Sequence, residues 1–131
     1  MMHYFLGLEV WQRTDEIFLS QGKYTVEILK KFCMTDCKSM PTPMVMDLKK
    51  MNDDDSDEID PQLIGSLIYL VNTRPDICYA VSVLSQFMSQ SRQTHWIAAK
   101  HVLRYLRGTV GYGLRYASGV DMRLQGYADA D

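Results

Sequence analysis

A stretch from residue 60 to 116 constrains this chain most, because its apolar residues recur every three or four positions and prolines divide it. Asp60 before Pro61 predicts a helix start, since the aspartate side chain can accept from free amides of the first turn and proline fits that turn. The same device at Pro75 predicts a second helix, and Thr94 can cap a third.

Each of these predicted helices carries one apolar face, and Gly108 is placed to end the third. Amphipathic helices with short connections pack as a small antiparallel bundle, which we expect over residues 61–110. The apolar positions are Leu63, Ile64, Leu67, Ile68 and Val71, then Ile77, Ala80, Val81, Leu84, Phe87 and Met88, then Trp96, Ala99, Leu103 and Leu106.

The N-terminal part has a different, alternating pattern. The alternation of residues 4–11 predicts one strand, which we expect to begin at the first residue with no leader before it. A polar turn at residues 13–15 and a second strand at 17–20 complete a predicted hairpin. Residues 24–32 have the spacing of a short amphipathic helix. Pro41 and Pro43 then exclude a helix.

A second hairpin is predicted at the C-terminus, from strands at 114–116 and 122–128. The predicted fold is therefore α+β: an N-terminal β-hairpin, a short helix, a three-helix bundle and a C-terminal hairpin, together a fragment of a larger fold. The predicted divisions are a hairpin and helix at 1–46, an acidic linker at 47–60, the bundle at 61–110 and truncated strands at 111–131.

Composition narrows the function classes. A net charge of −2 gives no global positive field for nucleic acid, and no apolar run is long enough to span a membrane. The odd, sparse set of 3 cysteines does not indicate a disulfide framework. We therefore expect an intracellular protein in a reducing compartment, without membrane contact.

A set of short phrases follows one another along nearly the whole chain: YFLGLEV, IFLSQGKYTVEILKKF, MPTPM, LIGSLIYLVNTRPDICYAV, LSQFM, HWIAAKHVLRYLRGT, YGL and GYADAD. Each is unspecific alone, but the ordered set resembles the Pol polyproteins of copia-type retrotransposons, at the end of reverse transcriptase and the start of ribonuclease H. The resemblance implies a primer-holding palm edge in the first hairpin, a thumb-like module in the helices, and RNA and DNA as partners of the parent polyprotein.

The resemblance also implies a role for Asp129, as the first carboxylate of a ribonuclease H site that binds two magnesium ions. Such chemistry needs several carboxylates that hold two cations about 4 Å apart. Asp129 alone fits that set here, and no Tyr-x-Asp-Asp sequence of a polymerase is present. We predict that the chain is not an enzyme and takes no cofactor, with magnesium belonging only to a complete parent enzyme.

A second resemblance rests on Arg104, Tyr105, Leu106 and Arg107, which spell RxLR. This pattern resembles the host-targeting motif of secreted effectors from downy mildews, some of which carry a copia-like segment. It implies an alternative function: a secreted protein that acts in the host cytoplasm or nucleus, binds an unknown host protein and suppresses plant cell death. Against it, no signal peptide is legible, and Leu106 belongs to the apolar face of a predicted helix.

Three basic residues of the last predicted helix are spaced at four and three. Lys100, Arg104 and Arg107 form a basic ridge that could contact phosphates, which predicts a nucleic-acid-binding module as a third function. An ordinary solvated helix face has the same pattern, so both interpretations stay open.

Overall fold

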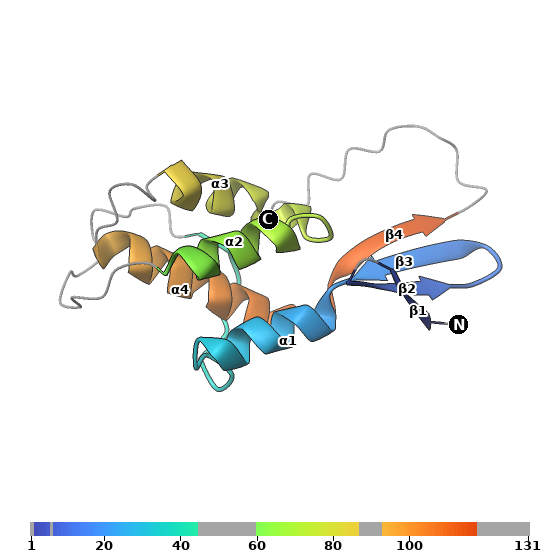
Figure 1. Cartoon of the computed structure of the whole chain (residues 1–131), viewed down its shortest axis with the longest axis horizontal. Coiled ribbons are helices and arrows are strands. Elements are labelled where there is room, and N and C mark those ends of the chain that lie inside the picture. The colour runs from blue at the N-terminus through green and yellow to red at the C-terminus, as the bar shows by residue number, and fades with distance from the viewer. Residues whose placement is uncertain (1, 6, 45–59, 87–92, 118–131) are drawn as a thin grey trace.

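The computed structural model describes residues 2–5, 7–44, 60–86 and 93–117. Figure 1 shows a small sheet at one end of the molecule and a cluster of helices at the other. The α+β class is therefore confirmed for the described residues. The elements are β1 (Met2–Phe5), β2 (Leu8–Gln12), β3 (Glu16–Ser20), α1 (Gly22–Lys31), α2 (Pro61–Leu70), the 3-10 helix η2 (Pro75–Ile77), α3 (Cys78–Gln86), α4 (Gln93–Gly108) and β4 (Gly113–Ala117).

The sheet has the order β1-β2-β3-β4, and every neighbouring pair is antiparallel. The predicted hairpin turn at residues 13–15 is confirmed, since the Arg13 amide donates to the Glu16 carbonyl at 2.9 Å. The prediction of one strand over 4–11 is wrong. Gly7 lies in a left-handed conformation at φ 80° and reverses the chain, so that Phe5 pairs with Leu8.

The strand predicted at 114–116 is present as β4, but its observed partner differs from the predicted one. β4 pairs with β3, and Leu114 lies opposite Leu19. The predicted partner at 122–128 lies outside the described residues. A segment near the end of the chain thus completes the N-terminal sheet, because the free edge of β3 offers unpaired backbone groups to β4.

The helix start at Asp60 is confirmed. At Pro75 the predicted side-chain cap is absent, because Arg74 before the proline makes no capping hydrogen bond, and a 3-10 helix begins there instead of an α-helix. The Asp60 side chain accepts from the Gln62 amide at 2.8 Å, and Pro75 begins η2, which leads directly into α3. Thr94 is not a cap, because α4 begins at Gln93 and Thr94 therefore lies inside the helix. The helix ends at Gly108, as predicted.

The hydrophobic core lies among four helices rather than the three predicted. Ile28 and Leu29 of α1 are buried together with residues of α2, α3 and α4, because α1 packs against α2 and α4. None of the described strand residues belongs to this core. The fully buried members include Leu63, Ile64, Leu67, Leu70, Ala99, Leu103 and Leu106. Within the described residues, no helix has the length and apolar character needed to cross a bilayer.

The sheet meets the bundle at a polar junction. The Thr73 hydroxyl donates to Oε1 of Gln21 at 2.7 Å, and both residues are only 1% exposed. Gly7 also lies close to Tyr69 of α2. A β-carbon at Gly7 would lie only 2.7 Å from the Tyr69 hydroxyl, so there is no room for a side chain there. These contacts tie the base of the sheet to the end of α2.

Candidate functional site

The RxLR sequence lies in the last two turns of α4, and the structure divides its residues between core and surface. Leu106 is fully buried and Tyr105 is 5% exposed, whereas Arg104 is half-buried and Arg107 is exposed. The predicted burial of Leu106 is therefore confirmed. In this conformation Leu106 cannot contact a binding partner that recognises all four residues of the motif.

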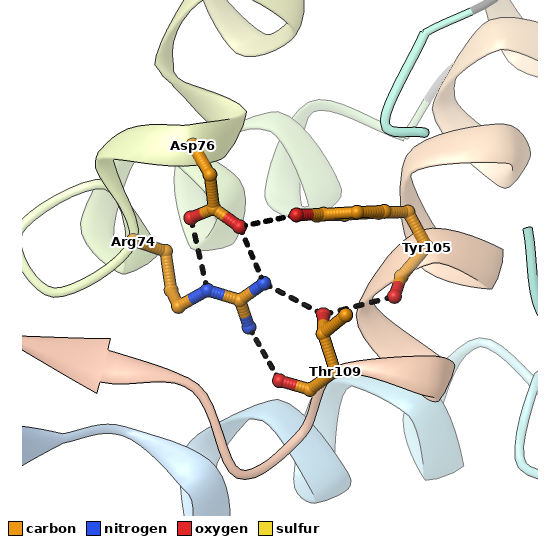
Figure 2. Close-up of polar contacts among 4 residues, drawn as sticks. All are labelled: Arg74, Asp76, Tyr105 and Thr109. Carbon is orange, nitrogen blue, oxygen red and sulfur yellow. Dashed lines mark hydrogen bonds and ion pairs between the residues drawn. The ribbon is translucent and has the colours of Figure 1, made fainter. Parts of the chain in front are cut away.

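A buried ion pair lies beside Tyr105. Arg74 is 2% exposed and forms a two-pronged pair with Asp76: Nε donates to Oδ1 at 3.0 Å and Nη2 to Oδ2 at 2.8 Å (Figure 2). Both residues flank Pro75 at the start of η2, so the backbone turn brings the two side chains together. Paired donors of this kind give the strongest hydrogen bonds between side chains.

The same arginine reaches across to the end of α4. Nη1 donates to the Thr109 carbonyl at 2.9 Å and Nη2 to the Thr109 hydroxyl at 2.6 Å. The Tyr105 hydroxyl closes the network by donating to Oδ2 of Asp76 at 2.6 Å, and the Thr109 hydroxyl donates to the Tyr105 carbonyl at 2.9 Å (Figure 2). The guanidinium also lies 5.2 Å from the centre of the Tyr112 ring.

The network shifts two acid–base equilibria. Burial raises the pKa of Asp76, but hydrogen bonds from Arg74 and Tyr105 and the charge of Arg74 outweigh burial and lower that pKa below its usual value. Burial, followed by the hydrogen bond to Asp76, raises the pKa of Tyr105 to about 12. Near neutral pH, Asp76 is therefore an anion and Tyr105 a neutral donor, which is the arrangement of a structural clamp.

The sequence pattern around Pro75 predicts only a helix start and does not reveal this cluster of Arg74, Asp76, Tyr105 and Thr109. A signal is nevertheless present, since opposite charges flank a proline between two predicted amphipathic helices. A cavity of about 450 Å³ lies beside the cluster, lined by residues 39–41 and by the end of α4.

The predicted basic ridge is partly covered by the protein itself. Arg107 Nε donates to the Thr35 carbonyl at 2.5 Å, and the Met40 amide donates to the Arg104 carbonyl at 3.4 Å. The Lys100 ammonium lies 5.1 Å from the centre of the Trp96 ring. Residues 35–42 thus run along the face of α4 that carries the ridge.

Asp129, the predicted metal ligand, lies outside the described residues, so its surroundings are not placed. Within the parts of the chain that the structure describes, no three His, Cys, Asp or Glu residues gather closely enough to hold a metal ion. The prediction of an incomplete magnesium site therefore stays a prediction.

Comparisons with known protein sequences relate this chain to mobile genetic elements. The chain is 40% identical, over 99% of its length, to the retrovirus-related Pol polyprotein from transposon RE2 of Arabidopsis thaliana, of which it spans 9%. It is 37% identical, over 99% of its length, to an uncharacterized mitochondrial protein of the same plant and spans 55% of that protein.

A shorter similarity concerns a different kind of protein. Over 52% of the chain, 52% of the residues are identical to secreted RxLR effector protein 161 of Plasmopara viticola, and this match spans 49% of the effector. No family model matches the chain. No solved structure matches it either. Because the matches to transposon Pol polyproteins of Arabidopsis thaliana and Nicotiana tabacum extend over nearly the whole sequence, the chain is homologous to a segment of copia-type retrotransposon Pol polyproteins.

Proposed function

We propose that this chain is a non-catalytic, structural segment of a copia-type polyprotein, at the junction of reverse transcriptase and ribonuclease H. The homology supports the polyprotein origin, but the chain spans only about 9% of the RE2 polyprotein. The Arg74 cluster supports a structural role. Its guanidinium bonds to Asp76 and Thr109 through all three nitrogens, and these bonds tie the start of η2 to the residue that directly follows α4. The segment would act inside the cell that carries the element.

A cleavage assay tests the absence of catalysis. The purified chain is incubated with an RNA–DNA hybrid and magnesium, beside the Asp129→Asn variant. We expect equal, background cleavage from both proteins, because two-metal hydrolysis needs several carboxylates and the sequence offers one matching residue. Magnesium-dependent cleavage that the variant lacks would contradict the proposal.

We also propose nucleic acid as a partner of the parent polyprotein rather than of the isolated ridge. Arg107 and Lys100 already contact Thr35 and Trp96 within the chain. If the ridge of three cations contacted duplex phosphates, log K would fall with log salt at a slope of about −3. Fluorescence anisotropy with a labelled duplex measures this slope, and we expect weak binding with a slope near zero.

A secreted effector is the second candidate, and the similarity to the Plasmopara viticola protein favours it. In that case the chain would act in the host cytoplasm or nucleus on a host protein. The accessible part of the motif is then limited to Arg107 and part of Arg104, because Tyr105 and Leu106 are buried.

The effector candidate is tested in plant cells that express the chain and receive an elicitor of cell death. Suppression that Arg107→Ala abolishes, with Arg115→Ala as the control at another exposed arginine, would support it. Unchanged cell death with the unmodified chain would remove it and leave the structural proposal standing.

A further inference from the structure

Thr42 has an unusual place in both sequence and structure. It is the only serine or threonine of the whole sequence that directly precedes a proline, and Pro41 precedes it. The side chain is exposed in a segment without helix or strand, and its hydroxyl makes a marginal 3.4 Å hydrogen bond to the Met44 carbonyl. The two prolines hold this segment out of a helix, so the hydroxyl is presented on an irregular, accessible backbone.

Side chains of α4 that carry nitrogen atoms lie next to this segment. The Met40 amide donates to the Arg104 carbonyl at 3.4 Å, and the backbone of Thr42 hydrogen-bonds to the imidazole of His101. Two side-chain nitrogens of the helix, Nε2 of His101 and Nε of Arg104, are buried without a hydrogen-bond partner. Nε of Arg104 is a donor, and Nε2 of His101 becomes one when the imidazole is protonated. Buried polar nitrogens are costly unless a further group satisfies them.

We propose that Thr42 is a phosphorylation site for a proline-directed protein kinase, and that His101 and Arg104 hold the phosphate against α4. In this reaction the Thr42 oxygen attacks the γ-phosphorus of ATP. The O–H bond breaks, a P–O bond forms, ADP leaves, and the hydroxyl proton passes to the base of the kinase.

The charge of a phosphate on Thr42 would complement His101 and Arg104. A phosphate adds close to two negative charges and acceptor oxygens for both orphan nitrogens. It would favour a protonated His101, whose pKa burial and the nearby charge of Arg104 lower in the unmodified protein. The modification would therefore fasten residues 40–44 to the helix.

The experiment treats the full chain with a proline-directed kinase and magnesium ATP and locates phosphate by mass spectrometry. We expect one phosphate, at Thr42, which Pro43→Ala removes and Ser39→Ala retains. Ser39 is the matched control because it is exposed, lies in the same segment and precedes a methionine. Phosphate at Ser39 instead, or none at all, would overturn the proposal of the site.

Nuclear magnetic resonance of His101 tests the binding of the phosphate separately. A phosphate within hydrogen-bond reach raises the imidazole pKa by about 1 unit or more. We expect this rise in the phosphorylated chain and a smaller one in phosphorylated Arg104→Gln. An unchanged His101 pKa after full phosphorylation would show that the phosphate points into solvent and would overturn the proposed contact. Neither result depends on the polyprotein origin, so both remain separable from the proposed function.

Discussion

The helical bundle and the sheet are stabilised by different kinds of interaction. The bundle buries a continuous set of aliphatic side chains, many at 0% exposure. The sheet contributes none of its described residues to that core and leaves Tyr4, Trp11 and Tyr116 exposed at 58%, 46% and 56%. The bundle is therefore stabilised by burial within the described chain, whereas the sheet depends on its ladder of hydrogen bonds and on a few contacts with α2.

This difference predicts which substitutions destabilise the whole molecule and which act only locally. A change in the bundle acts on the shared core and should unfold the helices together. A change in the sheet acts on half-exposed residues and should remain local.

The largest effect is expected for Leu67→Asp in α2. Leu67 is fully buried, so the variant places an unpaired carboxylate in the core and should cost about 4 kcal/mol or more of unfolding free energy. Ile68→Asp is the matched control on the same helix, because Ile68 is 51% exposed. Circular dichroism during heating should show a lost transition for the first variant and a nearly native one for the second.

Asp76→Ala should cost about 3 kcal/mol, because it leaves the Arg74 guanidinium buried without its anion. Glu16→Ala is the comparison in the sheet. Its partner Arg115 has a side chain 70% exposed, and such a surface pair contributes about 1 kcal/mol or less. Urea unfolding of both variants measures the difference. Equal losses would mean that the buried network contributes no more than a surface pair.

Stability should fall at both pH extremes through the Arg74 cluster. The raised pKa of Tyr105 stabilises the fold below pH 10, and this contribution is lost as the pH rises from 10 through about 12. The lowered pKa of Asp76 contributes above its unfolded value of 3.8 and is lost as the pH falls below that value. When unfolding free energies are measured against pH, Tyr105→Phe should reduce the alkaline decline and Asp76→Asn should reduce the acid decline.

Thr73→Val tests the junction between the two regions. It removes the hydroxyl that donates to Gln21, a buried residue, and should cost about 1–2 kcal/mol. Hydrogen exchange should then speed up in β3 more than in α2. Equal acceleration in both elements would show that sheet and bundle open as one unit.

Cys33→Gly should stabilise the end of α1 by about 1 kcal/mol. Cys33 has φ 57°, a left-handed conformation that glycine adopts without strain. The Cys33 amide donates to the Lys30 carbonyl and the Met34 amide to the Leu29 carbonyl, which is the bonding pattern that usually places glycine there. Thermal unfolding of the variant measures the gain, and a loss would point to a contact of the thiol side chain.

Much of the helical part was predictable because its signals are local. The cap at Asp60, the prolines and the spacing of Leu63 and Leu67 lie within a few residues of the structure they determine. The burial of Leu106 followed from the same periodicity. The reversal at Gly7 was missed because alternation continues on both sides of a tight turn, and only the pairing of Phe5 with Leu8 reveals it.

Local signals along the chain were enough to predict the α+β class, the helix start at Asp60 and the homology to copia-type polyproteins. The tertiary structure decided which segments meet: β4 beside β3, α1 in a four-helix core, and Arg74 between Asp76 and Thr109. The two kinds of feature differ because the interactions behind them act over different distances along the sequence. Helix caps and amphipathic spacing act through neighbouring residues, whereas Leu19 and Leu114, or Arg74 and Thr109, come together only when the whole chain has packed.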